Sequence, residues 1–355
     1  MRKKSKDFLK TLVSKASPSG FEKPAQQVFE TYLKGIADEI YGDYTGNKIA
    51  TLKTKTKNPL KIILAGHCDE IGLMVTTIEE TGQIRFTAIG GVDPAVLPGQ
   101  YVLLHTKNKS IKGVVGRKAI HLLKPEERGK VKKEQLWADF GFENKKAAEK
   151  IVRVGDPISY APNYEELIGQ NIVSKGCDDK VGVFVVAEAL RLVQENKSKN
   201  KSDIYSVSTT MEEIGARGAI TAAGGIEPDI GIAVDVTHAT DYPDGDKKLA
   251  GEVIIGKGPV IARGANISPI LFDKLVNIAV KKKIPYQIEA APKATGTDAN
   301  PIQISGKGVA TALISIPNRY MHTPSEVVNL KDLENAAKLI AELILSINPK
   351  TNLIP

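Results

Sequence analysis

Side chains of the types that bind divalent metal ions occur in several widely spaced segments of this chain. Histidine nitrogen and carboxylate oxygen are ligands that zinc and similar transition metals take in proteins. Most of the candidates stand at the end of a run that has the composition of a strand, or directly after it. They are His67, Asp178, Glu212, Glu213, Asp235 and His322. We therefore expect a metal centre assembled from residues that are distant in the sequence.

The number of candidates fits a centre with two ions. A carboxylate has two oxygens, so it can bridge two ions that lie roughly 3.5–4 Å apart. With Asp178 as the bridge, each ion takes two further protein ligands, and four residues fill that count: His67, Glu213, Asp235 and His322. Glu212 is then left as the general base that takes a proton from metal-bound water. The alternative interpretation of Glu212 is a surface acid.

The remaining histidines and one further aspartate have more than one interpretation. Asp69 follows His67 by two residues, so the two side chains share a face if the strand continues. Asp69 would then hold the imidazole in the tautomer that binds metal, and a turn-forming aspartate is the alternative. His105 and His121 are expected to be packed or surface residues. His238 is open between a substrate contact and support for a ligand.

Strands and helices alternate in the segments that carry the candidates. Apolar runs predict strands at residues 60–65, 229–236 and 309–316, and alternation predicts one at 204–210. Helical spacing predicts helices at residues 5–16, 22–40, 181–193, 268–282 and 330–345, and residues 252–262 are expected to be β. In open α/β sheets the carboxyl ends of the strands gather along one edge and bind ligands there. We therefore expect the candidates to meet at that edge.

The pattern of apolar, polar and turn-forming residues changes between about residues 72 and 163. Short β segments are separated there by glycine, proline or Lys-Asn turns. This stretch is expected to form a small β-barrel inserted into an α/β domain. The predicted organisation is a discontinuous catalytic domain at 1–71 and 164–355, and an inserted dimerisation or assembly domain at 72–163.

Composition excludes several other classes of protein. The chain has 355 residues and a net charge of +8, but the lysine clusters are spread thinly and aromatic residues make up only 5%. A nucleic-acid surface is therefore not expected. Polar residues interrupt every apolar run before the ~18 residues that span a bilayer. With two cysteines and no signal peptide, we expect a cytoplasmic protein without a disulfide framework or membrane segment.

Five motifs occur in the same order as in a known family. The chain resembles the tetrahedral (TET-type) aminopeptidases, which include glutamyl, leucyl and lysyl aminopeptidases and carry two catalytic metal ions. The motifs are Gly66–Gly72, Gly176–Gly182, Glu212–Gly215, Asp235–His238 and Arg319–Glu326. The resemblance covers essentially the whole chain. It implies a phosphorylase/hydrolase-like α/β/α sandwich with an inserted PDZ-like β-barrel.

The resemblance also implies roles for individual residues. Asp178 matches the bridging ligand and Glu212 the catalytic base, and Asp69 matches the residue behind His67. His67 and Asp235 match the ligands of one ion, and Glu213 and His322 those of the other. The ions would be zinc or cobalt, the substrates peptides, and the assembly a tetrahedral dodecamer built from dimers, with dimers alone as the alternative. The family pattern further predicts a cis peptide bond between Asp178 and Asp179.

Each of the two cysteines stands next to a candidate ligand. Cys68 stands where methionine is common in the family, and Cys177 precedes Asp178, so we hypothesise that the two thiols lie close enough to interact.

The alternative functions are a deacylase or carboxypeptidase on the same scaffold, a glycosidase, and a non-catalytic metal-dependent assembly protein. A glycosidase has no use for His67 and His322. The preferred N-terminal residue is not predicted.

Overall fold

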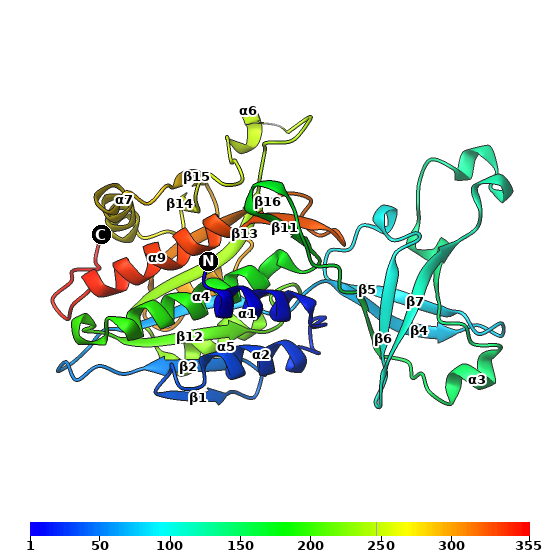
Figure 1. The fold of residues 1–355 in the computed structure, drawn as a ribbon, viewed down its shortest axis with the longest axis horizontal. Helices are drawn as coiled ribbons and strands as arrows, with labels where there is room; N and C mark the ends of the chain where they lie inside the picture. The colour runs from blue at the N-terminus through cyan, green and yellow to red at the C-terminus, as the bar shows by residue number, and fades with distance from the viewer. Residues whose placement is uncertain (246) are drawn as a thin grey trace.

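A mixed eight-stranded sheet forms the centre of the larger part of the molecule (Figure 1). The computed structural model describes residues 1–245 and 247–355. In sheet order the described strands are β1 (Glu39–Gly42), β2 (Lys48–Leu52), β12 (Asp203–Thr209), β3 (Lys61–His67), β13 (Ile230–His238), β16 (Ala310–Asn318), β14 (Val260–Gly264) and β15 (Gln287–Ala291). The four central strands β12, β3, β13 and β16 are parallel. Their carboxyl ends therefore lie at one edge.

Both faces of this sheet are buried because the central strands are apolar on both sides. On β3, Ile62 and Leu64 belong to one core and Ile63 and Ala65 to the other. One layer of helices contains α1 (Lys3–Ser14), α2 (Lys23–Leu33), α4 (Cys177–Glu195), α7 (Pro269–Lys282) and α9 (Leu330–Ser346). The opposite layer contains α5 (Arg217–Ile226) and α8 (Ala299–Gln303). The result is an α/β/α sandwich.

The smaller part of the molecule is a closed antiparallel barrel, drawn at the right of Figure 1. Its strands, in barrel order, are β4 (Gly72–Ile78), β5 (Ile84–Ile89), β8 (Leu136–Asp139), β7 (Ser110–Arg117), β6 (Tyr101–His105) and β9 (Pro157–Tyr160). The short helix α3 (Lys145–Glu149) lies beside it. The barrel has a separate apolar core, so it is a small domain inserted between β3 and α4.

A third, small sheet joins two segments that carry candidate ligands. It consists of β10 (Glu165–Glu166), β11 (Asn171–Ser174) and β17 (Glu326–Asn329), all antiparallel. β11 leads into α4, and β17 follows the loop that contains His322. The remaining described α-helix is α6 (Lys247–Ala250). No described helix is long and apolar enough to cross a membrane.

The predicted α/β/α sandwich with an inserted barrel is confirmed, but several expected elements were wrong in extent. The second helix ends at Leu33 because Gly35 adopts a left-handed conformation with φ of +83°, and Ile40 lies in β1 instead of on that helix. Of the β segment expected at 252–262, only residues 260–262 form a strand, as the start of β14. The small third sheet was not predicted, because its strands are too short to show a period.

Candidate metal centre

The sequence candidates meet where the central strands end, at the start of α4. His67 is the last residue of β3 and pairs with Thr209, the last residue of β12, so Glu212 and Glu213 emerge beside it. Asp235 lies inside β13, three residues before the strand ends. The expectation that Asp235 ends its strand was therefore wrong, because the strand continues to His238. Asp178 comes from the first turn of α4, and His322 from the loop after β16.

Asp178 lies between the two histidines and presents a different oxygen to each. Its Oδ1 is 3.2 Å from His67 Nε2, and its Oδ2 is 3.1 Å from His322 Nε2. Two groups of potential ligand atoms share it, and within each group the atoms lie within 4.8 Å of one another. One group is His67, Asp178 and Asp235, and the other is Asp178, Glu213 and His322.

The remaining carboxylates surround these contacts. His67 Nε2 lies 3.9 Å from Asp235 Oδ1 and 3.9 Å from Glu212 Oε2. His322 Nε2 lies 3.5 Å from Glu213 Oε2. The two groups differ in solvent access, since the side chain of His67 is 2% exposed and that of His322 is 37% exposed. Solvent therefore reaches the cluster from the side of His322.

The outer nitrogen of each histidine ring faces an oxygen, which orients the ring. His67 Nδ1 lies 3.1 Å from the carbonyl oxygen of Asp69 and 3.4 Å from its Oδ1. His322 Nδ1 lies 3.1 Å from the carbonyl oxygen of Gly91, in the turn after β5 of the barrel. When Nδ1 carries the proton and donates it there, the lone pair of Nε2 points into the cluster, as in metal-binding histidines.

Asp69 connects the segment of His67 to that of the glutamate pair. Its Oδ1 accepts from the backbone N–H of Glu212 at 3.0 Å, and its Oδ2 accepts from that of Glu213 at 3.1 Å. Ser19 Oγ donates to Oδ2 at 2.7 Å. The carboxylate is fully buried. Asp69 thus fixes the backbone of both glutamates and also lies beside His67.

Two further buried carboxylates hold the ligand segments and were not among the sequence candidates. Asp179 Oδ2 accepts from the backbone N–H of His67 at 3.2 Å. Glu326 accepts from the backbone N–H groups of Asp178 and His322. Sequence reasoning missed both because their partners are main-chain groups that only the fold brings together. Two signals could have found them: each stands within four residues of a candidate ligand, and each lies inside one of the motifs Gly176–Gly182 and Arg319–Glu326.

The acidic groups are crowded and buried, and this crowding changes their pKa values. Burial, together with the neighbouring carboxylates, raises the pKa of Glu212 to about 7 and that of Glu213 to about 8. Burial also raises the pKa of Asp235 well above its usual value. Burial opposes ionisation of Asp178 as well, but hydrogen bonds from His322 and His67 outweigh it and lower its pKa. The hydrogen bond to Asp178 raises the pKa of His322 to about 9.

These residues fit divalent metal ions. Within the described part of the chain, Glu213 Oε1 is buried without a hydrogen-bond partner, which is costly unless a cation or water satisfies it. Several carboxylates in one buried cluster repel one another, and cations remove that repulsion. The donor set of imidazole nitrogen and carboxylate oxygen suits zinc and related transition metals.

The predicted cis peptide bond between Asp178 and Asp179 is present. The other sequence expectations concern residues away from the cluster. His105 is packed between Ser110 and Ser159 of the barrel, while His121 and His238 are exposed.

Both cysteines are free and buried. Cys177 Sγ lies 3.7 Å from the carbonyl oxygen of Ser174, and burial raises the pKa of both thiols. No disulfide joins the two cysteines.

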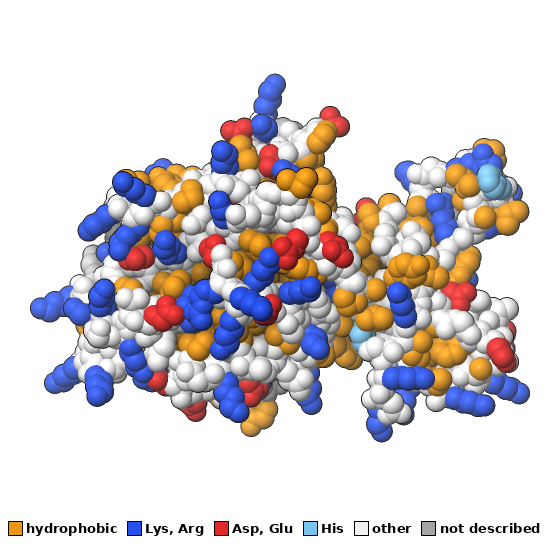
Figure 2. Space-filling view, viewed as in Figure 1, with side chains coloured by type: hydrophobic (Ala, Val, Ile, Leu, Met, Phe, Trp, Pro, Cys, Tyr) orange, Lys and Arg blue, Asp and Glu red, His pale blue; other side chains and the backbone are white. Residues whose placement is uncertain are grey.

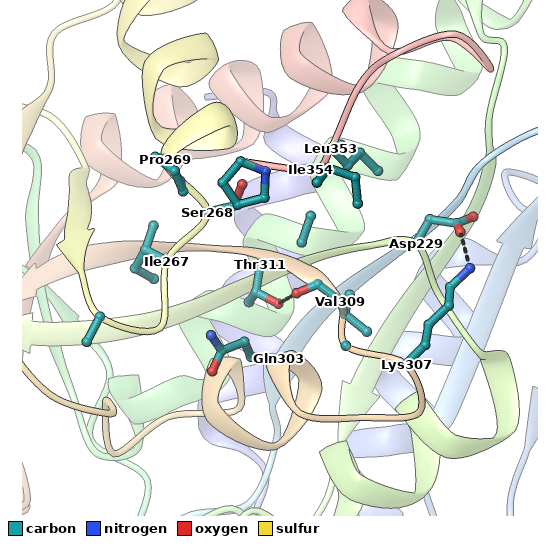
Figure 3. Close-up of a pocket in the computed structure, with 14 residues that line it drawn as sticks. Asp229, Ile267, Ser268, Pro269, Gln303, Lys307, Val309, Thr311, Leu353 and Ile354 are labelled. Atoms are coloured by element: carbon teal, nitrogen blue, oxygen red, sulfur yellow. Dashed lines mark hydrogen bonds and ion pairs between the residues drawn. The ribbon is translucent and has the colours of Figure 1, made fainter.

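Other surfaces do not compete with this cluster as a site. A cavity of about 490 Å³ lies at the opposite ends of β13 and β16, and Figure 3 shows that Lys307 and Asp229 form an ion pair at its rim. None of the candidate ligands lines that cavity. Figure 2 shows lysine and arginine side chains scattered over the visible face without a single basic patch. Among the described residues, the groups of potential metal ligands lie at the edge of the sheet.

Known proteins share both this fold and this chain length. The lysyl aminopeptidase of Pyrococcus furiosus is 37% identical over 347 residues, covering 97% of each chain. A crystal structure of a TET aminopeptidase from a Thaumarchaeota archaeon superposes with a TM-score of 0.92 at 32% identity, covering 97% of each chain. The TET1 peptidase of Pyrococcus horikoshii, which can assemble into a tetrahedron or a large octahedral shell, gives 0.86 at 29% identity, with coverage of 97% and 100%.

Fold, cluster and relatives together define the class as a peptide hydrolase. The model of the M42 glutamyl aminopeptidase family matches residues 46–339. The chain belongs to this family, as the resemblance predicted. Aminopeptidase activity and the use of divalent metal follow from that membership.

Proposed function

We propose that this aminopeptidase works with two divalent ions per chain and with Glu212 as the general base. The observation that carries the proposal is the position of Asp178, whose two oxygens face different histidines at 3.2 and 3.1 Å. A carboxylate shared in this way suits a bridge between two ions. His67 and Asp235 would complete one ion's ligands, and Glu213 and His322 those of the other. Zinc or cobalt suits these donors equally.

Bound divalent ions would polarise the scissile carbonyl and make an attacking water more acidic. Glu212 is free for proton transfer because neither ligand group requires it. Its Oε2 lies 3.9 Å from His67 Nε2. Glu212 therefore lies beside the cluster but belongs to neither of the two ligand groups that share Asp178. From there it would accept the proton of the attacking water and pass it to the leaving amine.

Removal of N-terminal residues fits the charge of the site. A free α-amino group is cationic, and those carboxylate oxygens of the cluster that do not bind an ion would attract it. His322 is the partly exposed member, so we place the substrate on its side. The catalytic domain would comprise residues 1–71 and 164–355. The barrel domain, residues 72–163, would serve self-association from dimers to a dodecamer, in a cytoplasmic enzyme.

A substrate panel with metal-stripped protein tests this function. The protein is treated with a chelator, reconstituted with zinc or cobalt, and assayed on aminoacyl anilides with a free or an acetylated α-amino group. We expect hydrolysis only after metal is restored and only of the free-amino substrates, with two ions per chain by elemental analysis. Cleavage of acetylated substrates or of N-acyl amino acids at a similar rate would instead favour a deacylase. Cleavage of oligosaccharides would favour a glycosidase.

A further inference from the structure

The loop between β16 and β17 holds His322 in a conformation that needs support. Arg319 and Val327 close the loop through two backbone hydrogen bonds of 3.0 Å. Inside it, His322 has a φ of +61°, a left-handed conformation that few residues other than glycine adopt. Such a residue persists only where its surroundings hold it in place. A contact to the main chain of His322 is therefore required.

Glu326 supplies that contact and a second one at the same time. Its Oε1 accepts from the backbone N–H of His322 at 2.9 Å, and its Oε2 accepts from the backbone N–H of Asp178 at 3.0 Å. The side chains of the same two residues meet at the 3.1 Å contact between Asp178 Oδ2 and His322 Nε2. One carboxylate thus links the main chains of two residues whose side chains converge on one ligand group.

The position of Glu326 is fixed by rigid elements. Its main chain pairs with Ser174 in the β11–β17 ladder, four residues before Asp178. Asn163 connects the same two segments, because its Nδ2 donates to the carbonyl oxygen of Pro324 at 2.7 Å and its Oδ1 accepts from the N–H of Lys175 at 2.8 Å. Glu326 is 2% exposed, so water does not compete for its oxygens.

We propose that Glu326 is a positioning residue of the metal centre, which sets the spacing at which Asp178 and His322 share one ion. A further carboxylate beside several others is electrostatically unfavourable, yet both of its oxygens face N–H groups instead of the ligand atoms. Its role is to hold the ligand segments and not to bind the ion. This inference rests on the proposed two-ion function.

Glu326→Gln is the direct test because it keeps the shape of the side chain. A glutamine has one acceptor oxygen, so its amide NH₂ must face one of the two backbone N–H groups. The ion shared by Asp178 and His322 should then bind about 10–100-fold more weakly, as is usual when a residue that orients a ligand is changed. Affinity is measured by competition between the metal-stripped protein and a chromogenic chelator for zinc. The absorption spectrum of the cobalt form reports the ligand geometry.

Asp332→Asn provides a matched control. Asp332 is also a fully buried carboxylate that accepts two backbone N–H bonds, from Gly256 at 2.6 Å and Gly258 at 2.8 Å. It holds no candidate ligand segment, so both ions should bind to Asp332→Asn with wild-type affinity. An equal loss in both variants would overturn the proposal, because it would show a general effect of removing a buried carboxylate.

Further outcomes separate this inference from the proposed function. Wild-type affinity for both ions in Glu326→Gln would overturn the inference while leaving the two-ion function intact. Failure of the wild-type protein to bind two ions would overturn the proposed function itself. If Glu326→Gln does not fold, Glu326→Asp keeps the charge but is one methylene too short to reach both N–H groups. Glu326→Asp should show the same selective loss, and unchanged binding in it would contradict the proposal.

Discussion

At the scale of single residues, the cluster combines acids that are hard to ionise together. Without metal, burial raises the pKa of Glu212 from its usual 4.5 to about 7 and that of Glu213 to about 8. The hydrogen bond to Asp178 raises the pKa of His322 from 6.5 to about 9. Between about pH 4.5 and 9 the folded chain therefore holds more protons at these groups than the unfolded chain does.

This imbalance predicts how the stability of the metal-free protein depends on pH. Stability falls as pH rises wherever the folded state binds more protons, so the melting temperature of the chelator-treated protein should decrease from pH 5 to pH 8. Metal needs the deprotonated ligands, so the stabilisation by zinc should grow over the same range. Calorimetric scans at four pH values, with zinc and with chelator, measure both effects. A metal-free melting temperature that rises from pH 5 to pH 8 would contradict this assignment.

The side chains that the structure gathers in the cluster could be named from the sequence, whereas the backbone contacts that hold their segments could not. Four candidates stand at or after the ends of strands, namely His67, Glu212, Glu213 and His322. Their side chains are of the types that usually bind metal ions. Asp235 was found by type, although its strand runs two residues beyond the apolar run at 229–236. Glu326 gives no such signal, because its function depends on N–H groups that fold against it.

At the scale of elements, one turn of the barrel domain contacts the ligands directly. Gly91 accepts from His322 Nδ1 when that nitrogen is protonated. Gly90 has a φ of +73°, and a Cβ added there would lie 2.9 Å from Ile71 Cγ2 and 3.3 Å from Glu213 Cβ. The turn after β5 therefore forms part of the wall around Glu213 and His322.

Gly90→Ala should weaken the metal centre through this contact. The alanine methyl group must displace Ile71 or Glu213, so we expect zinc affinity and kcat/KM to fall by about tenfold or more. Gly99→Ala is the control, since Gly99 also has a positive φ of +82° but nothing within 4 Å of the added Cβ. Both variants should lose about 1–3 kcal/mol of stability to backbone strain. Equal zinc affinity in the two variants would show that the contact at Gly90 is unimportant.

The central elements were predicted well because their hydrophobic patterns are long. β3 is a continuous buried run, and α9 is buried over most of its length with a clear helical period. The helix expected at 22–40 was predicted too long, because a periodic pattern does not show where a left-handed glycine ends the helix. β10, β11 and β17 span two to four residues each, which is too short for a pattern.

At the scale of the whole molecule, the barrel projects from the sandwich (Figure 1), and we propose that it serves self-association. Sedimentation or light scattering of the purified protein should give twelve times the 38.3 kDa mass of one chain. Deleting the barrel would also remove the turn that contacts His322, so full-length protein is the appropriate sample. A mass of twice the chain would support the dimer alternative, and a monomer at micromolar concentration would contradict self-association.

If Glu212 moves a proton while Glu213 holds an ion, one pair of variants distinguishes the two roles most directly. Glu212→Gln and Glu213→Gln are the same change at adjacent residues. Glu212→Gln should keep two ions per chain by elemental analysis and lose about 10²–10⁴-fold in kcat, whereas Glu213→Gln should lose affinity for one ion. A Glu212→Gln protein that binds both ions and turns over peptides within tenfold of the wild-type rate would contradict the account.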